Sequence, residues 1–71
     1  MPLDDALLEV ERFLDNAVLA SLQQVTIIHG KGTGVLRAGI AKALKQDKRV
    51  ASYRLGRYGE GESGVTICEL R

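Results

Sequence analysis

The stretch VTIIHGKGTGVLR, residues 25–37, decides the fold because it joins an apolar run to a helical pattern through a glycine-rich turn. The run before His29 is short, β-branched and almost continuously apolar, which is typical of a strand in the middle of a sheet. Glycines at alternate positions 30, 32 and 34 end that strand. After the turn, Leu36, Ile40 and Leu44 recur at helical spacing. The sequence thus predicts a strand, a turn and a helix in direct succession.

The segments on either side of this unit predict the remaining elements. Residues 3–22 repeat apolar side chains at steps of three and four, which predicts a helix with one apolar face. Residues 49–56, RVASYRLG, alternate as a strand does, and residues 65–70, VTICEL, form a last apolar strand. Between these strands, residues 57–64, RYGEGESG, form a glycine-rich loop. The expected order is helix, strand, helix, strand, strand.

The same patterns assign particular side chains to the core. Cys68 is expected to be a buried thiol because it follows Ile67 in an apolar strand. Gly39 is expected to allow the second helix to pack closely on the sheet. In the alternating strand, Val50, Ser52 and Arg54 are expected on one face and Ala51, Tyr53 and Leu55 on the other, and Tyr53 is expected in the core.

The element order indicates an α/β chain, folded as an α+β two-layer sandwich with two helices on one face of a mixed sheet. A strand–helix–strand unit is normally a right-handed parallel crossover. Because the first helix has no strand before it to cross over from, a strand N-terminal to residue 1 is expected. Residues 1–71 are expected to form one domain, since a chain this short buries only about 60% of its unfolded surface.

Composition excludes several classes of site. The chain has one cysteine and one histidine, so it can form neither an internal disulfide nor a Cys/His metal cluster. No segment approaches the roughly 18 apolar residues of a membrane span, and no charged-then-apolar leader opens the chain. A soluble cytoplasmic domain is therefore expected.

Charge is segregated along the chain, although the formal net charge is only +1. Residues 1–22 carry five acids and one base, whereas residues 31–57 carry eight bases and one acid. A basic half of this kind favours a polyanion such as a nucleic acid as partner. The alternative is an ordinary solvated helix face. The eight bases are Lys31, Arg37, Lys42, Lys45, Lys48, Arg49, Arg54 and Arg57.

The glycine turn has the composition of an anion site. Gly30, Gly32 and Gly34 permit positive φ angles and close approach of another molecule. The helix that follows adds unpaired N–H groups and a partial positive charge, and Lys31 and Arg37 add full charges. A phosphate group is the expected ligand. The turn is neither a G-x-G-x-x-G fingerprint nor a Walker A loop, so a small nucleotide is not favoured.

His29 stands immediately before this turn and has two possible roles. A histidine near a phosphate site can act as general base or acid, with Lys31 stabilising charge in a phosphodiester transition state. A lone histidine at a strand end can equally be a hydrogen-bonding residue that binds phosphate without chemistry. The residues alone leave both roles open.

The loop at residues 57–64 offers further candidates. Tyr58 could stack on a base or pack on the sheet edge. Glu60 and Glu62 could hold a divalent ion such as Mg²⁺ or Mn²⁺, although two loop carboxylates are usually just solvated. Arg54 and Arg57 flank the loop and are expected to contact the nucleic-acid backbone.

Three segments together resemble the Smr (small MutS-related) domain: IIHGKGTGVLR at 27–37, RVASYRLG at 49–56 and GEGESGVTICEL at 59–70. The H-G-x-G-x-G stretch after an apolar strand is the most specific motif. The ending G-V-T-I-x-E-L is similar to the last strand of Smr domains at the C-terminus of the second bacterial MutS paralogue. The resemblance covers essentially the whole chain.

This resemblance implies a two-layer β-α-β-α-β-β fold similar to the C-terminal domain of translation initiation factor three. Its mixed sheet places the last strand between its neighbours and antiparallel to them. The resemblance also implies DNA nicking and suppression of recombination within a homodimeric MutS-type ATPase, and a link to ribosomal RNA on collided or stalled ribosomes. The motif carries over to His29, Gly30, Lys31, Gly32, Thr33 and Gly34.

The chain departs from the family pattern in two places. It lacks the opening L-D-L-R/H-G strand, which the family places near the histidine loop and associates with nuclease activity. It also has Glu62 and Ser63 where the family often has paired glycines. Three hypotheses follow: a nicking nuclease domain, a non-catalytic DNA- or RNA-binding module, and a tail that binds an acidic protein.

Overall fold

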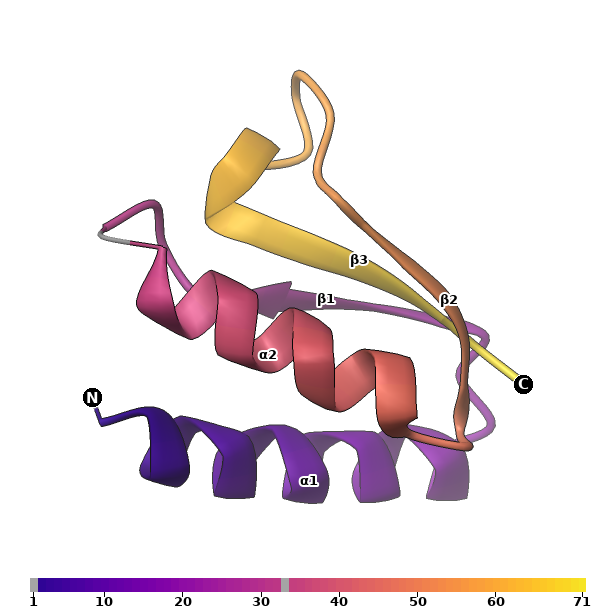
Figure 1. Cartoon of the computed structure of the whole chain (residues 1–71). Coiled ribbons are helices and arrows are strands. Elements are labelled where there is room, and N and C mark those ends of the chain that lie inside the picture. The colour runs from indigo at the N-terminus through magenta and orange to yellow at the C-terminus, as the bar shows by residue number, and fades with distance from the viewer. Residues whose placement is uncertain (1, 33) are drawn as a thin grey trace.

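The structure is a computed structural model that describes residues 2–32 and 34–71. The order of elements confirms the predicted helix, strand, helix, strand, strand (Figure 1). The elements are α1 (Leu3–Leu19), β1 (Gln24–Ile28), α2 (Val35–Gln46), β2 (Val50–Leu55), a 3₁₀ turn (Glu62–Gly64) and β3 (Val65–Leu70). The predicted loop therefore ends in a helical turn directly before the last strand.

The sheet has the order β1-β3-β2, and β3 pairs antiparallel with both neighbours. The resemblance to Smr domains predicted this central position for the last strand. The apolar run before His29 was predicted to be a strand in the middle of the sheet. This prediction is wrong: among the described strands, β1 lies at an edge and pairs only with β3. The burial along β1 alternates, and Ile28 is 81% exposed. Its β-branched residues thus cover both an inner and an outer face.

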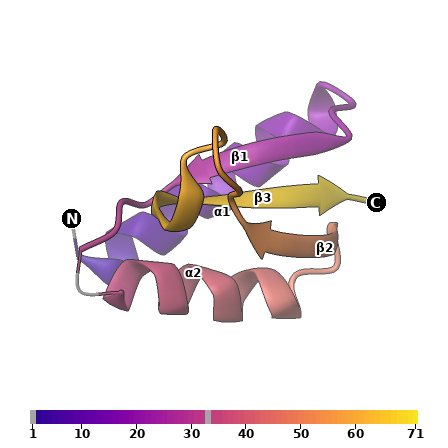
Figure 2. The same ribbon diagram turned by 90° about the horizontal axis from the view of Figure 1, so that it is seen from above.

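The two helices lie on one face of the sheet, as predicted (Figure 1). Seen from above, the three strands lie side by side, with α1 behind β1 and α2 alongside β2 (Figure 2). Both ladders among the described strands are antiparallel, so the parallel pair of a mixed sheet is not among them. A strand before residue 1 stays a prediction. Neither helix in the described ranges has the length and apolarity that a membrane crossing requires.

The core is a single layer between the sheet and the two helices. Leu14 of α1, Leu44 of α2 and Cys68 of β3 are each at most 1% exposed. Burial of the Cys68 thiol confirms its prediction and raises its pKa. Gly39 makes room for the side chain of Leu3, so it serves close packing of α2 on α1 rather than on the sheet as predicted.

A bulge in β2 overturns the predicted alternation of that strand. Val50 pairs with Leu70, but Ser52 pairs with Glu69, so Ala51 is an extra residue in the ladder. Val50 therefore faces the core on the same side as Tyr53. A strict two-residue period could not place both side chains on one face.

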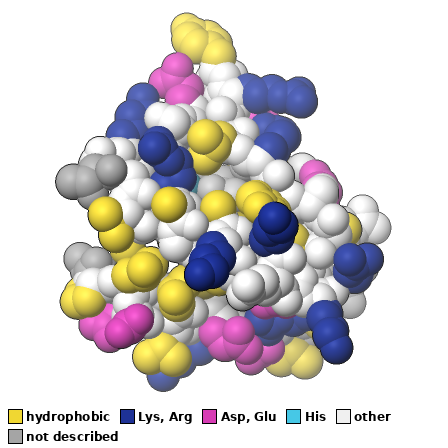
Figure 3. All heavy atoms as spheres, in the orientation of Figure 1, with side chains coloured by type: hydrophobic (Ala, Val, Ile, Leu, Met, Phe, Trp, Pro, Cys, Tyr) yellow, Lys and Arg dark blue, Asp and Glu magenta, His cyan; other side chains and the backbone are white. Residues whose placement is uncertain are grey.

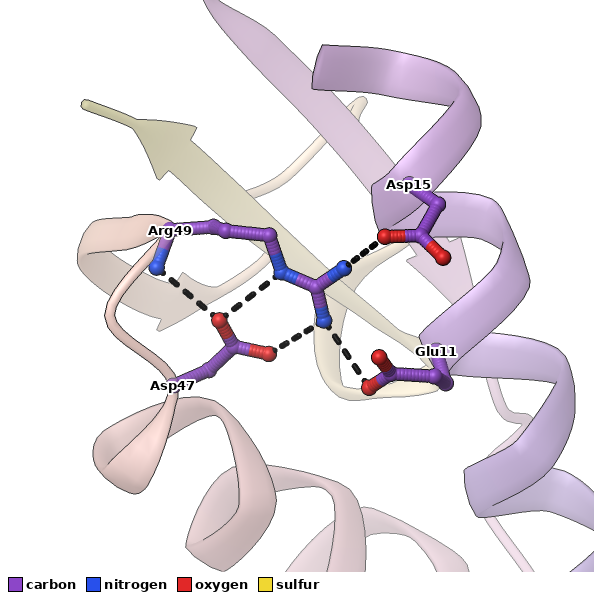
Figure 4. Close-up of polar contacts among 4 residues, drawn as sticks. All are labelled: Glu11, Asp15, Asp47 and Arg49. Atoms are coloured by element: carbon purple, nitrogen blue, oxygen red, sulfur yellow. Dashed lines mark hydrogen bonds and ion pairs between the residues drawn. The ribbon is translucent and has the colours of Figure 1, made fainter. Parts of the chain in front are cut away.

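Arg49 joins α1 to the connection between α2 and β2 (Figure 4). Its guanidinium donates to Asp47 at 2.6 Å and to Glu11 at 2.9 Å, and it also pairs with Asp15. Hydrogen bonds from Arg49 lower the pKa of Asp47, and the same contact raises the pKa of Arg49. One of the eight bases in the basic segment is therefore engaged in holding the fold together.

Candidate nucleic-acid interface

The glycine turn between β1 and α2 has the backbone geometry that its sequence predicts. Gly30 has φ +77° and Gly34, the N-cap of α2, has φ +87°. A side chain at either position would strain the backbone, because L-residues rarely adopt these angles. A Cβ atom at Gly32 would meet no atom within 4 Å, so the backbone there is open to another molecule. The turn leads directly into the positive end of the α2 dipole.

A hollow of about 390 Å³ lies at this turn. It brings together most of the residues predicted to bind phosphate. Pro2 and Leu3, at the start of α1, also line it. Thr33 lies outside the described residues. The predicted residues that line the hollow are His29, Gly30, Lys31, Gly32, Gly34 and Arg37.

His29 makes hydrogen bonds through both ring nitrogens. Nδ1 lies 2.9 Å from the carbonyl oxygen of Gly30, and Nε2 lies 2.8 Å from Oγ1 of Thr66. Because a carbonyl only accepts, Nδ1 carries the hydrogen. In the neutral ring, Nε2 then accepts from the Thr66 hydroxyl, and in the imidazolium both nitrogens donate. The ring is thus held in one orientation and one neutral tautomer.

Thr66 is a site residue that the sequence reasoning missed. It is 2% exposed, lies on the central strand β3 and is opposite Ile27 in the ladder, two residues before His29. Its hydroxyl is a buried polar group that requires a hydrogen-bond partner, and Nε2 of His29 is that partner. The available signal was a threonine within the apolar run VTICEL, but its partner lies 37 positions away in sequence.

The end of the β2–β3 loop is fixed to the turn by the backbone. The carbonyl oxygen of Gly64 accepts from the N–H of His29 at 3.1 Å and from the N–H of Gly30 at 2.9 Å. Lys31 crosses to the same loop, and its Nζ donates to Glu62 Oε2 at 3.2 Å. Glu62 itself adopts φ +52°, an angle that non-glycine residues rarely take. The loop therefore supplies a carboxylate to the predicted charge-stabilising lysine.

A second glutamate of the loop pairs with a second residue that was predicted to bind nucleic acid. Arg54 donates to Glu60 at 2.7 Å and 3.1 Å, and the N–H of Arg57 donates to the same carboxylate at 2.7 Å. The Arg54 hydrogen bonds, followed by that of Arg57, lower the pKa of Glu60 to about 2. Glu60 and Glu62 thus each pair with a base, and within residues 2–32 and 34–71 no three acidic, histidine or cysteine side chains cluster as metal ligands.

The other residues predicted to bind nucleic acid differ in whether they lie near the turn. Arg54 shares a neighbouring hollow of about 250 Å³ with Arg37, so it is connected to the turn through that side chain. Arg57 and Tyr58 do not line the hollow at the turn. Tyr58 is 95% exposed, which excludes the predicted alternative that it packs on the sheet edge.

Basic side chains are spread over the face of the molecule that carries α2 and is turned toward the viewer in Figure 3. The arrangement provides positive charge, an open backbone and a helix N-terminus at one hollow, with an oriented imidazole at its edge. Such a site suits one phosphate of a polyanion. The pairs formed by Glu60 and Glu62 partly neutralise the charge that the sequence counts had suggested.

Comparison with known proteins gives a consistent family. The model of the Smr domain matches residues 1–71. Endonuclease MutS2 of Caldanaerobacter subterraneus subsp. tengcongensis is 71% identical over 70 residues, which is 99% of this chain and 9% of the relative. Endonuclease MutS2 of Acetivibrio thermocellus is 65% identical over 69 residues, 97% of this chain and 9% of the relative. The chain thus spans about a tenth of the length of these relatives.

Solved structures agree with this result. The crystal structure of the Smr domain of Thermus thermophilus MutS2 has a TM-score of 0.98 and 45% identity, covering 100% of this chain and 89% of that one. YdaL, a stand-alone small MutS-related protein from Escherichia coli, has a TM-score of 0.93 and 28% identity, covering 100% and 59%. The chain belongs to the Smr domain family, as the H-G-x-G-x-G turn and the final strand predicted.

Proposed function

We propose that this Smr domain binds DNA through its backbone phosphates and nicks it at the turn formed by residues 29–34. The observation that carries the proposal is the hollow in which His29, Lys31 and Arg37 meet the glycine backbone and the start of α2. Relatives with up to 71% identity over this region bear the name endonuclease. The reaction is hydrolysis of a phosphodiester, in which water forms a bond to phosphorus and an ester oxygen leaves.

The side chains divide the work of this reaction. The glycine backbone and the N-terminus of α2 hold the phosphate oxygens, and Lys31 and Arg37 offset the charge that grows on them. His29 takes the proton of the attacking water or donates one to the leaving oxygen. Because Nε2 is held by Thr66 and Nδ1 by Gly30, proton transfer requires substrate or water to replace one of these partners.

The same geometry supports a second candidate, a binding module without chemistry. Both ring nitrogens of His29 already have partners within the chain, which is the arrangement of a structural histidine. In that case the turn positions a longer protein on DNA or ribosomal RNA, and the imidazole shapes the phosphate site. The two candidates differ in one property, which is whether removal of the imidazole changes a rate or only an affinity.

The family supports a wider setting for either activity. We place the domain in a longer cytoplasmic MutS-type ATPase, dimeric through other regions, which acts in suppression of recombination. This setting is proposed for the whole protein, because the match to this chain covers only 9% of the length of a relative. The 71-residue chain itself is the unit tested below.

The direct test is nicking of supercoiled plasmid by the chain and by His29→Ala, each with and without EDTA. The proposal predicts that open-circle product forms and that His29→Ala lowers its rate by about 10² or more. Persistence of nicking in EDTA would place the chemistry on the protein's own residues. Absence of nicking by this chain and by an N-terminally extended chain, together with salt-sensitive DNA binding, would establish the binding module instead.

An N-terminally extended chain adds a second arm to this test. The strand expected before residue 1 is proposed to complete the catalytic site, because the family associates it with nuclease activity. If the extended chain nicks and the 71-residue chain does not, the phosphate site and the chemistry are separable. Lys31→Ala in both chains then shows whether the lysine contributes to binding, to rate or to both.

A further inference from the structure

Two hollows lie between α2 and β2, beside the hollow at the glycine turn. Their volumes are about 250 Å³ and about 470 Å³, and Tyr53 lines both. The first hollow begins at Arg37, which also lines the hollow at the turn. The second continues past the C-terminal end of α2 to Lys48. We call these two hollows the α2–β2 groove.

Basic side chains line this groove at both ends. Arg37 and Arg54 stand at the end near the turn, where Glu60 offsets much of the charge of Arg54, and Lys45 and Lys48 stand at the other end. The acid in the groove, Asp47, is already bound by Arg49 at 2.6 Å and so offsets little of this charge. The groove as a whole is therefore attractive to an extended anion rather than to a single phosphate.

The middle of the groove is apolar and offers an aromatic ring. Ala38 and Ala41 are small residues on the helix side, and Leu55 lies opposite on β2. Tyr53, which is partly buried against the core, lines both hollows. A base has a flat apolar face that packs on such a ring, whereas an acidic peptide has charge but no matching face. In a duplex the base faces are covered by stacking, so this surface fits an unpaired strand.

We propose that the α2–β2 groove holds a single strand of DNA that continues from the phosphate bound at the turn. Its phosphates lie against the basic side chains at the two ends of the groove, and one of its nucleobases packs on Tyr53. From Arg37 to Lys45 the helix rises about 12 Å, which corresponds to roughly three or four stacked nucleotides. This inference rests on the proposed function and names its substrate class, a DNA in which one strand is unpaired next to the nick.

The test measures binding of fluorescein-labelled oligothymidylate of about 12 nucleotides by anisotropy, in EDTA and over a series of salt concentrations. The double variant Lys45→Gln/Lys48→Gln should weaken binding and reduce the slope of log K against log salt by about 1.4, since each lost contact to a single strand contributes about 0.7. Lys42→Gln is the matched control. It lies on the exposed part of the same helix and lines neither hollow.

A second variant separates the shape of the groove from its charge. Ala41→Leu fills the middle of the groove and leaves every charge in place. It should weaken binding of the oligonucleotide by about tenfold, which is the loss of one stacked base. Circular dichroism at the assay temperature shows whether each variant is folded, so that loss of binding is compared only among folded chains.

The proposal is overturned if Lys42→Gln weakens binding, per charge removed, as much as the double variant does, because diffuse charge would then explain the affinity. It is also overturned if duplex DNA or an RNA strand of equivalent sequence binds more tightly than the DNA strand. Its failure is distinct from failure of the nuclease proposal. Nicking that depends on His29, with normal binding by the double variant, would contradict the groove proposal alone. Groove-dependent binding without any nicking would contradict the nuclease proposal alone.

Discussion

Nε2 of His29 lies 2.8 Å from Oγ1 of Thr66, so the one imidazole of the chain is held by a buried hydroxyl of the central strand. This contact connects the fold to the chemistry. The antiparallel ladder places Ile27 opposite Thr66, and the chain continues from there to the ring that the hydroxyl orients. The geometry of the candidate site is therefore set by the pairing of β1 with β3.

Replacing Thr66 by valine should release the histidine ring. Valine has a similar shape but no hydroxyl, so Nε2 loses its partner, and the free energy of unfolding should fall by about 1 kcal/mol. Long-range ¹H–¹⁵N spectra of the ring should show a change at Nε2, which loses its hydrogen bond, while Nδ1 keeps its hydrogen because the Gly30 carbonyl still accepts from it. Thr66→Ser restores the hydroxyl and should restore the spectrum. An unchanged ring spectrum in Thr66→Val would contradict the assignment of Thr66 as the orienting residue.

Replacing Glu62 by glutamine should strengthen DNA binding. The carboxylate pairs with Lys31 at 3.2 Å, and both side chains are more than half exposed, so the pair is weak and competes with phosphate for the lysine. Binding at low salt should increase by up to about fivefold, the equivalent of an exposed ion pair. The matched control is Glu9→Gln, an exposed acid on α1. Weaker binding by Glu62→Gln than by this control would show that Glu62 helps to bind DNA.

Replacing Arg49 by glutamine should destabilise the fold without acting on the site. The guanidinium is 22% exposed and bonds to carboxylates of both α1 and the α2–β2 connection. Its loss should lower the free energy of unfolding by about 1.5–3 kcal/mol, as measured by urea denaturation. The neighbouring Lys48→Gln should change it by less than about 0.5 kcal/mol. Equal effects of the two substitutions would contradict a structural role for Arg49.

The ion pair between Glu60 and Arg54 should give the chain a distinct response to acid. The pKa of Glu60 is lowered to about 2, from an ordinary value near 4.5. A lowered pKa in the folded state stabilises it above the unfolded pKa, and that contribution is lost as pH falls from about 4.5 toward 2. The difference in stability between the wild-type chain and Glu60→Gln should therefore shrink over this window. A constant difference from pH 6 to pH 2.5 would contradict the pairing.

Local periodicity predicted most of the fold. The bounds of β3 agree with the predicted residues 65–70, and α2 forms where Leu36, Ile40 and Leu44 recur at helical spacing. Periodicity failed where neighbours in space decide the outcome. The extra residue Ala51 in β2, and the edge position of β1 among the described strands, depend on pairing with β3, which a single strand's sequence does not contain.

The candidate site was predictable in its backbone and less so in its partners. The glycine spacing placed the turn, His29, Lys31 and Arg37 at one hollow. Thr66 and Glu62 form hydrogen bonds with His29 and Lys31 from segments more than 30 positions away in sequence, and nothing local marks them as partners. Charge counts also misjudged the basic segment, because Arg49 is engaged by three acids in space.

The measurement that tests the central claim most directly compares nicking and DNA binding by the wild-type chain and His29→Ala on the same preparations. If the turn holds the phosphate and His29 moves the proton, nicking should fall by about 10² or more while the dissociation constant for DNA changes by less than about tenfold. A variant that nicks plasmid at the wild-type rate, with binding unchanged, would contradict the account, because the imidazole would then take no part in the chemistry.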